Sequence, residues 1–242
     1  MKILIMSDIH GNEQALKAVL DKVETEYKVD GCFLLGDIID YGMHSNEVIS
    51  MLYQLSFPVF CNICGNHEDA VLHDNYERFS SKRGEESARY TKSVLNPDSW
   101  DYIHNEMKEC GFYEFECDGK MCLAVHGSLE DKYWKSIKPE EALQEYREYD
   151  YVFSGHSHQP HFIEKYYEAE DAERRNKKKV VFINPGSVGQ PRNHNPQAQF
   201  VILNMDTEQV FFDKVSYNIK KEQEAYCGQV DEFYCERLKW GI

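Results

Sequence analysis

The sequence predicts an α/β fold around a parallel β-sheet, because short apolar segments alternate with amphipathic helical patterns near its N-terminus. Three such apolar segments occur, at residues 2–6, 31–35 and 58–64. Their apolar residues are nearly continuous, which is typical of strands buried on both faces. Each segment is followed by polar residues, where the strand ends. Because helices connect these strands, we expect right-handed crossovers and a parallel arrangement.

Two helices are predicted between these strands. In residues 12–26, and again in residues 45–55, apolar side chains recur every three or four positions, which gives each helix one apolar face. Ser45 is a suitable N-cap for the second helix, because its hydroxyl can accept a hydrogen bond from a free backbone N–H group.

The rest of the chain divides into a helical part and a strand-rich part. Residues 68–109 are polar and helical in pattern, and we expect them to form a cap over the polar cluster that they follow. Asp118-Gly119 favours a tight hairpin between two strands. A last helix is expected over residues 219–238. The expected strands of this part cover residues 113–117, 121–125, 151–154, 161–167, 180–184, 199–204 and 209–215.

These parts are expected to form one domain over residues 1–242, with the helical segment as an insertion. We find no internal repeat and no linker rich in Pro, Gly or Ser. A charged stretch that begins near Glu164 and closes with residues 177–179 is interpreted as a solvated hairpin loop.

Composition and charge exclude several classes of protein. The chain has 242 residues, of which 42% are hydrophobic and 29% are charged, as in a globular protein. Its formal net charge of −15 argues against a coat on long nucleic acids, which requires a basic surface. No apolar run approaches the roughly 20 residues of a membrane helix. Eight cysteines without a secretory signal predict reduced thiols and a cytoplasmic location.

Residue types that bind metals gather at the ends of five expected strands. In open α/β sheets, ligands bind outside the carboxyl ends of the strands, so we expect these side chains to meet there. An aspartate or histidine at one strand end is commonly a turn residue, but five such ends together indicate a site. In the order of their strands, the residues are Asp8 and His10, Asp37, Asn66 and His67, His126, and His156 and His158.

The ligand set combines oxygen and nitrogen donors without an obligatory thiolate. This composition disfavours Ca²⁺ and suits Mn or Fe, with Zn, Ni or Mg as alternatives. These candidate ligands are too many for one ion but suffice for two ions that share a bridging carboxylate. Two metals about 3.5–4 Å apart are a recurring device of phosphoryl transfer. The sequence therefore predicts a dinuclear site for divalent metal ions.

The order of these motifs resembles the calcineurin-like metallophosphoesterase superfamily. The resemblance implies a four-layer αββα sandwich of two mixed β-sheets flanked by helices, with a helical cap insertion. Asn184-Pro185-Gly186-Ser187-Val188-Gly189-Gln190-Pro191-Arg192 is further similar to the small prokaryotic branch of phosphodiesterases and diadenosine-tetraphosphatase-like enzymes. The superfamily motifs are Asp8-Ile9-His10-Gly11-Asn12, Gly36-Asp37-Ile38-Ile39-Asp40, Gly65-Asn66-His67-Glu68, His126-Gly127 and Gly155-His156-Ser157-His158.

The resemblance also implies roles for single residues. His67 would protonate the leaving alkoxide or stabilise the charged transition state. Glu68 would either orient His67 or serve as an acid in the first turn of a helix. Asp40 is interpreted as a capping or supporting residue. One metal would be held by Asp8, His10, Asp37 and His158, and the other by Asp37, Asn66, His126 and His156.

The implied activity is hydrolysis of a small phosphate ester, either a phosphodiester or a nucleotide polyphosphate, by hydroxide that the two metals activate. Alternatives are a phosphomonoesterase or protein phosphatase, and a non-catalytic scaffold of the same fold. Tyr41 stands where Ser/Thr phosphatases of this superfamily carry a phosphate-binding arginine, which disfavours that class. Arg192 could contact phosphate instead, or form a salt bridge on its loop, and Asn12 could touch the substrate or the bridging water.

Cys61 and Cys64 form a C-x-x-C pattern within the third expected strand. A redox or zinc-binding role would need both side chains on one side of the chain. A strand places residues three apart on opposite faces, so we interpret both cysteines as core residues.

Overall fold

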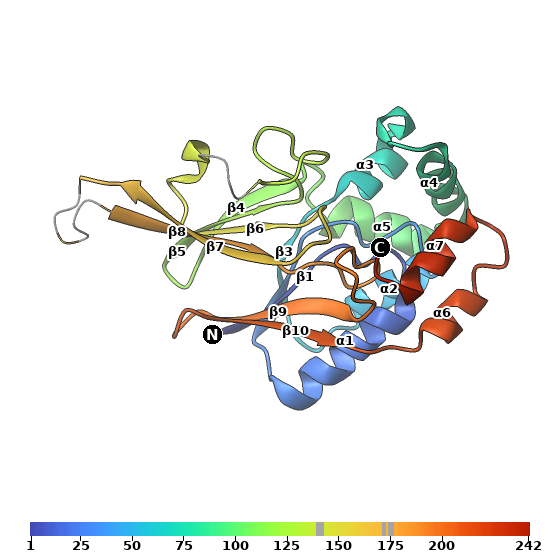
Figure 1. Ribbon diagram of the computed structural model, residues 1–242, viewed down its shortest axis with the longest axis horizontal. Helices are drawn as coiled ribbons and strands as arrows, with labels where there is room; N and C mark the ends of the chain where they lie inside the picture. The colour runs from blue at the N-terminus through green and yellow to red at the C-terminus, as the bar shows by residue number, and fades with distance from the viewer. Residues whose placement is uncertain (139–142, 171–172, 174–176) are drawn as a thin grey trace.

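Two mixed five-stranded β-sheets pack face to face in the centre of the molecule (Figure 1). The computed structural model describes residues 1–138, 143–170, 173 and 177–242. Most of the helices lie at the end of the sandwich that the carboxyl ends of the central strands approach (Figure 1). This arrangement confirms the predicted sandwich of two mixed sheets.

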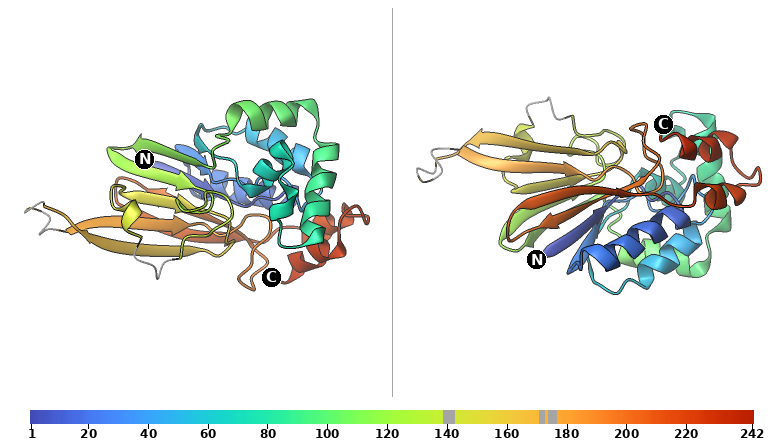
Figure 2. Two further views of the ribbon diagram at one scale, coloured as in Figure 1. Left: turned by 90° about the horizontal axis from the view of Figure 1, so that it is seen from above. Right: turned by 60° about the horizontal axis from the view of Figure 1, so that its bottom comes forward.

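The first sheet contains the three parallel strands that the sequence predicts. β1 pairs with β2, and β2 with β3, in parallel, while β9 and β10 extend the sheet on the other side as an antiparallel pair. Helix α1 (Glu13–Glu26) and helix α2 (Ser45–Tyr53) cover the outer face of this sheet (Figure 2). The strand order is β10 (Gln209–Val215), β9 (Ala198–Asn204), β1 (Lys2–Met6), β2 (Gly31–Leu34) and β3 (Val59–Asn62).

The second sheet has three parallel strands between two antiparallel edge strands. The pairs β5–β6 and β6–β8 are parallel, whereas β4 and β7 run antiparallel to their neighbours. Cys117 pairs with Lys120, so Asp118 and Gly119 form the predicted two-residue hairpin, with φ of 52° and 70°. The strand order is β4 (Phe112–Cys117), β5 (Lys120–Val125), β6 (Tyr151–Ser154), β8 (Lys177–Asn184) and β7 (His161–Glu168).

The β7–β8 hairpin is longer than expected. Residues 177–179 belong to β8 and pair with the last residues of β7, so the prediction of a loop there is wrong. Alternating exposed and half-buried residues along β7 allow charged side chains to remain in a strand at the sheet edge. Part of the expected loop, at residues 171–172 and 174–176, lies outside the described residues.

The apolar core has one layer on each side of each sheet, which explains the continuous apolar runs. Ile3 and Ile5 of β1 point into the core between the sheets, whereas Leu4 and Met6 point toward the helices. On the outer face of the second sheet, Tyr146 of the short 3₁₀ helix η2 (Gln144–Tyr146) packs in a third core layer. Both faces of the central strands are therefore buried.

Cys61 and Cys64 lie in different core layers, as predicted. Cys61 packs between the sheets, and Cys64 packs on the helical side of the first sheet. Burial raises the pKa of the Cys64 thiol well above its usual value, so this thiol is not poised for redox chemistry. All eight cysteines are free thiols.

The helical insertion begins inside the third motif rather than after it. It consists of α3 (Asn66–His73), the 3₁₀ helix η1 (Tyr76–Arg78), α4 (Lys82–Val94) and α5 (Pro97–Glu106). The Ser81 hydroxyl caps α4 and the Asn96 side chain caps α5, with Pro97 as the first residue of α5. The insertion is helical as predicted.

The C-terminal segment differs from the single helix expected over residues 219–238. It forms α6 (Ile219–Glu224), α7 (Glu232–Glu236) and the 3₁₀ helix η3 (Arg237–Lys239). Cys227 and Gly228 have φ of 41° and 78°, which ends the first helix, and the Asp231 side chain caps the second. Helix α7 lies beside α4, where the Arg83 guanidinium covers the Phe233 ring (Figures 1 and 2). Within the described part of the chain, no helix has the length and apolar character needed to cross a membrane.

Candidate metal centre and active site

The predicted ligands meet where the carboxyl ends of β1, β2, β3, β5 and β6 converge. One group comprises Asp8, His10, Asp37 and His158, and a second comprises Asp37, His126 and His156. The ligand atoms of each group lie within 4.8 Å of one another, and all but His156 are buried. Asp37 belongs to both groups, so its carboxylate would be shared if an ion bound to each.

In the first group, two histidines are held with one ring nitrogen facing inward. His10 Nδ1 lies 3.2 Å from the Ile39 carbonyl oxygen, and His158 Nδ1 lies 2.6 Å from that of Gln190, so each Nδ1–H donates to a carbonyl. The two Nε2 atoms then face each other at 3.2 Å. Burial lowers the pKa of both rings well below its usual value, so both inward atoms carry lone pairs.

His126 is oriented in the same way in the second group. Its Nδ1–H donates to the Leu35 carbonyl at 2.7 Å, and its Nε2 lies 3.1 Å from Asp37 Oδ2 and 3.1 Å from Asn66 Oδ1. Burial by itself would lower the pKa of His126, but the Asp37 carboxylate raises it to about 9. A divalent cation at this place would take the position of that proton.

His156 completes the second group with its other ring nitrogen. Its Nε2–H donates to the Trp134 carbonyl at 3.1 Å, which turns Nδ1 toward Asn66 Oδ1 at 2.8 Å. Every histidine of the centre therefore has its outer N–H bound to a main-chain oxygen, the arrangement that fixes metal-ligating imidazoles.

The donor atoms fit divalent cations. Asp8 Oδ1 is buried, has no hydrogen-bond donor among the residues that the structure describes, and lies 3.1 Å from His158 Nε2, which has no proton to give. Burial raises the pKa of Asp8 to about 7. Lone pairs and carboxylate oxygens facing one another inside a protein repel unless a cation lies between them. Mixed imidazole and carboxylate ligation suits Mn, Fe, Zn or Ni.

The ligands sit on strained backbone. Positive φ is uncommon for residues other than glycine, and such strain clusters at functional sites. Close packing adds to the constraint, since a Cβ on Gly65 would lie 2.1 Å from Asp37 Oδ1. The ligands with positive φ are Asp8, His10, Asp37, His156 and His158, with values from 49° to 62°.

His67 is supported by Asp40, and Glu68 has the second of its two predicted roles, that of an acid in the first turn of α3. His67 Nδ1 lies 2.6 Å from Asp40 Oδ2, and His67 Nε2 lies 3.9 Å from Asp37 Oδ2, facing the metal centre. Burial would lower the pKa of His67, but the Asp37 and Asp40 carboxylates raise it above its usual value. A ring in this position with a raised pKa would suit a general acid.

The prediction that Glu68 orients His67 is wrong. Both oxygens of Glu68 accept hydrogen bonds from main-chain N–H groups at 2.7–3.1 Å. Glu68 thus joins the turn that contains Asp37 to the start of α3. It is a positioning residue for Asp37. The four N–H groups belong to Asp37, Ile38, Ile39 and Gly65.

Asn12 has a structural role in place of the expected contact with substrate. Its Oδ1 caps α1 by accepting from Ala15 N at 3.0 Å. Its Nδ2 donates to the Gly189 carbonyl at 3.0 Å and to the Tyr217 hydroxyl at 3.2 Å. The side chain is buried and fully used by these contacts.

Arg192 lies beside the metal centre. It is one of the charges that lower the pKa of His10, His156 and His158, after burial itself. Among the residues that the structure describes, none forms an ion pair with Arg192, and its buried Nε has no hydrogen-bond partner. The alternative of a salt bridge on its loop is therefore not observed.

Four residues at the site were not predicted. Ser87 Oγ and Thr91 Oγ1 of α4 donate to Asp40 Oδ1 at 2.6 and 2.9 Å. Their spacing of four residues puts both hydroxyls on one helix face, a signal visible in the sequence. Phe79 contacts His67, and Trp134 contacts His156, with ring centroids 5.0 and 6.3 Å apart. Nothing in the sequence pattern of the Trp134 loop indicates this placement.

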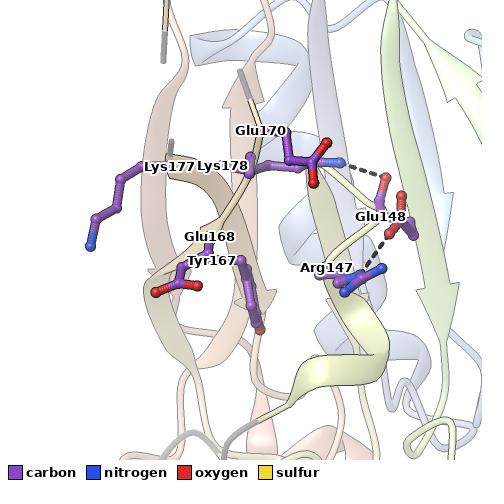
Figure 3. A pocket seen from close by; sticks show the side chains of 8 residues that line it. Arg147, Glu148, Tyr167, Glu168, Glu170, Lys177 and Lys178 are labelled. Atoms are coloured by element: carbon purple, nitrogen blue, oxygen red, sulfur yellow. Dashed lines mark hydrogen bonds and ion pairs between the residues drawn. The ribbon is translucent and has the colours of Figure 1, made fainter. Parts of the chain in front are cut away.

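A separate pocket on the β7–β8 hairpin is not part of the site (Figure 3). Arg147 and Glu148 form an ion pair there, and Lys178 Nζ donates to the Glu148 carbonyl at 2.7 Å. The pocket is at the start of β8, whose eight residues span about 25 Å. The metal centre lies toward the other end of that strand.

Comparisons with known proteins agree with this geometry. The calcineurin-like phosphoesterase superfamily domain matches residues 1–208. The chain is 29% identical over 252 residues to an uncharacterized protein of Methanocaldococcus jannaschii, covering 99% of this chain and 98% of that one. It is 26% identical over 175 residues to the symmetrical bis(5'-nucleosyl)-tetraphosphatase of Ectopseudomonas mendocina, covering 71% of this chain and 60% of that enzyme.

The fold has a close counterpart among solved structures. A metallophosphoesterase from Sphaerobacter thermophilus superposes with a TM-score of 0.77 at 28% identity, and the match covers all of both chains. The family motifs, the fold and the converging ligands lead to the same assignment. The chain belongs to the calcineurin-like phosphoesterase superfamily.

Proposed function

We propose that the protein hydrolyses small phosphate esters, either phosphodiesters or nucleoside polyphosphates, with two divalent metal ions. The observation that carries this proposal is the pair of ligand groups that share Asp37, with His67 Nε2 3.9 Å from its carboxylate. Two cations bound to these groups would lower the pKa of a shared water and neutralise phosphate oxygens.

The residues of the chain would supply the remaining steps. His67, whose Nδ1 contacts the Asp40 carboxylate, would give its Nε2 proton to the departing oxygen. Arg192, free of any carboxylate among the described residues, would bind a non-bridging phosphate oxygen. A positively charged centre also explains how a chain of net charge −15 would attract an anionic substrate.

The comparisons and the cysteines support the proposed substrate class and a cytoplasmic location. The tetraphosphatase relative acts, by its name, on a dinucleoside polyphosphate, which favours a nucleotide substrate over a phosphoprotein. Tyr41 is buried against His67, with ring centroids 4.3 Å apart, where a protein phosphatase of this superfamily would need an arginine. Eight free thiols suit the reducing cytoplasm.

A panel of substrates and metals tests the proposal. Initial rates are measured with Mn²⁺, Fe²⁺, Zn²⁺ or Ni²⁺ on bis(p-nitrophenyl) phosphate, p-nitrophenyl phosphate, cyclic nucleotides, dinucleoside polyphosphates and a phosphopeptide. We expect metal-dependent turnover of the diester or the polyphosphates. Turnover restricted to monoesters would assign a phosphomonoesterase, and inertness on every substrate in the metal-loaded protein would favour a scaffold.

A further inference from the structure

Trp134 is a large aromatic residue that no hydrophobic core accounts for. It is half-buried and belongs to none of the apolar clusters formed by the described residues. Its indole Nε1 is buried and has no hydrogen-bond partner among the described residues. The exposed part of the ring is therefore surface that no apolar core uses.

The loop after β5 holds Trp134 rigidly. Asp131 Oδ1 accepts hydrogen bonds from the main-chain N–H groups of Tyr133 and Trp134 at 3.2 and 3.1 Å. Asp131 Oδ2 accepts from Arg78, whose guanidinium lies 5.3 Å from the centre of the indole ring. A cation over an indole face is attractive, so the ring is fixed between its own loop and η1.

Phe79 continues this aromatic surface from Trp134 to His67. The rings of Phe79 and Trp134 meet edge to face, with centroids 5.2 Å apart. Phe79 contacts His67 at 5.0 Å, and Trp134 contacts His156 at 6.3 Å. Phe79 and Trp134, here called the aromatic pair, therefore span the side of the metal centre that lies between His67 and His156.

We infer that the aromatic pair forms the subsite for the leaving group and accepts a flat aromatic group, such as a nucleobase. The inference rests on the proposed function, because a leaving group that takes a proton from His67 must lie beside that ring and hence beside Phe79. Both rings are half-buried, so each presents surface to an incoming group.

Binding of nucleotides provides the test, because stacking of a base on an aromatic side chain contributes about 1–3 kcal/mol. Titrations compare adenosine 5'-monophosphate with ribose 5-phosphate, which lacks the base. We expect the metal-loaded wild type to bind the nucleotide about ten-fold more tightly, since tenfold corresponds to about 1.4 kcal/mol. Phe79→Leu and Trp134→Leu should reduce this preference to about two-fold or less, and Trp134→Phe should keep part of it.

Tryptophan fluorescence gives a second readout that does not depend on turnover. The nucleotide should quench the emission of Trp134, and Trp134→Phe should abolish that change. Trp240→Phe is the matched control, because Trp240 is 62% exposed and its loss should leave the quenching unchanged. Metal content should be retained in Trp134→Leu, since His156 contacts the main-chain oxygen of residue 134 and not the indole.

Two failures can be told apart. If the metal-loaded protein hydrolyses bis(p-nitrophenyl) phosphate but binds both ligands equally, the inference is overturned and the proposed function stands. If the preference for the nucleotide persists in both leucine variants, the base is bound elsewhere and the inference is also overturned. Absence of hydrolysis of any phosphate ester would contradict the proposed function itself.

Discussion

The Asp40 carboxylate links His67 to the helical insertion. One of its oxygens accepts from His67 Nδ1 at 2.6 Å, and the other accepts from Ser87 Oγ and Thr91 Oγ1 of α4. Asp40 is fully buried and has φ of 70°, so its direction is set by the turn after Asp37. The insertion is therefore more than a cover, because two of its hydroxyl groups hold the carboxylate that contacts His67 Nδ1.

Substitution of Asp40 tests this relationship. We expect Asp40→Asn to lower kcat about 10–100-fold, because the support of a catalytic or ligating histidine is typically worth that factor. The amide can present its NH₂ group to His67 Nδ1, which would disfavour the doubly protonated ring that the proposed acid requires. Steady-state kinetics with bis(p-nitrophenyl) phosphate measures the loss, and elemental analysis checks that the metal content is unchanged.

Two further variants complete that test. His67→Ala should lose most turnover while keeping both metals, and full activity in this variant would exclude a role as acid. Asp21→Asn, on an exposed face of α1, is the control and should behave as wild type. An unchanged kcat in Asp40→Asn would show that His67 does not depend on Asp40 for its function.

Removal of Asp37 should empty or disorder the metal centre. Its carboxylate belongs to both ligand groups, so Asp37→Ala removes one ligand from each ion. We expect fewer than two ions per chain by elemental analysis and a loss of metal-dependent activity. Chelation of the wild type should lower Tm, since a cation at about 100 times its Kd stabilises the folded state by about 2.7 kcal/mol. Two tightly bound ions in Asp37→Ala would contradict the bridging role.

Glu68 should matter for stability more than for the chemical step. In Glu68→Gln, an NH₂ group replaces an oxygen that accepts from main-chain N–H groups. Buried donors left unpaired cost about 1–3 kcal/mol each. We expect Tm to fall by about 5–15 °C in a domain of this size. Glu24→Gln, on the exposed side of α1, is the control. A normal Tm combined with a selective loss of kcat would restore a catalytic role for Glu68.

The metal centre was predictable because it depends on topology. Asp8, Asp37 and Asn66 each follow a continuous apolar strand, and parallel strands bring their carboxyl ends to one edge. The order of the strands and the identity of the ligands both follow from patterns of a few residues. The alternation of apolar strands and amphipathic helices likewise sufficed for the parallel part of the first sheet.

The contacts around the centre were less predictable, because they depend on side-chain directions. Asp40 and Glu68 both belong to the motifs around His67, so the sequence does not show which carboxylate contacts the ring. In the structure, Asp40 has left-handed backbone and its carboxylate contacts His67 Nδ1. The Asn12 amide could either cap α1 or contact a substrate, and the sequence does not distinguish the two. In the structure it caps α1 and donates to the carbonyl of Gly189, a residue far along the chain. In the C-terminal segment, the left-handed backbone at Cys227 and Gly228 interrupts the single helix that was expected, and Gly228 is the sign of that break in the sequence.

A pH-dependent contact joins the C-terminal segment to α2. His44 Nδ1 lies 2.9 Å from Glu222 Oε1, and the His44 side chain is only 23% exposed. The hydrogen bond to Glu222 raises the pKa of His44, against the opposing effect of burial. A raised pKa means that folding favours the charged ring, so the contribution is complete below the unfolded pKa of about 6.5 and is lost as pH rises through the folded value.

His44→Gln isolates this charge, because glutamine can keep a hydrogen bond to Glu222 at every pH. We expect the variant to melt about 2–4 °C below wild type near pH 6, the shift for about 1 kcal/mol in a domain of this size. Because wild-type His44 loses its proton as pH rises, the gap should close as pH passes above the raised pKa of His44 in the folded protein. Thermal melts of the metal-loaded proteins measure the difference in Tm between wild type and variant. A difference that stays constant with pH would show that the charge of His44 does not contribute to stability.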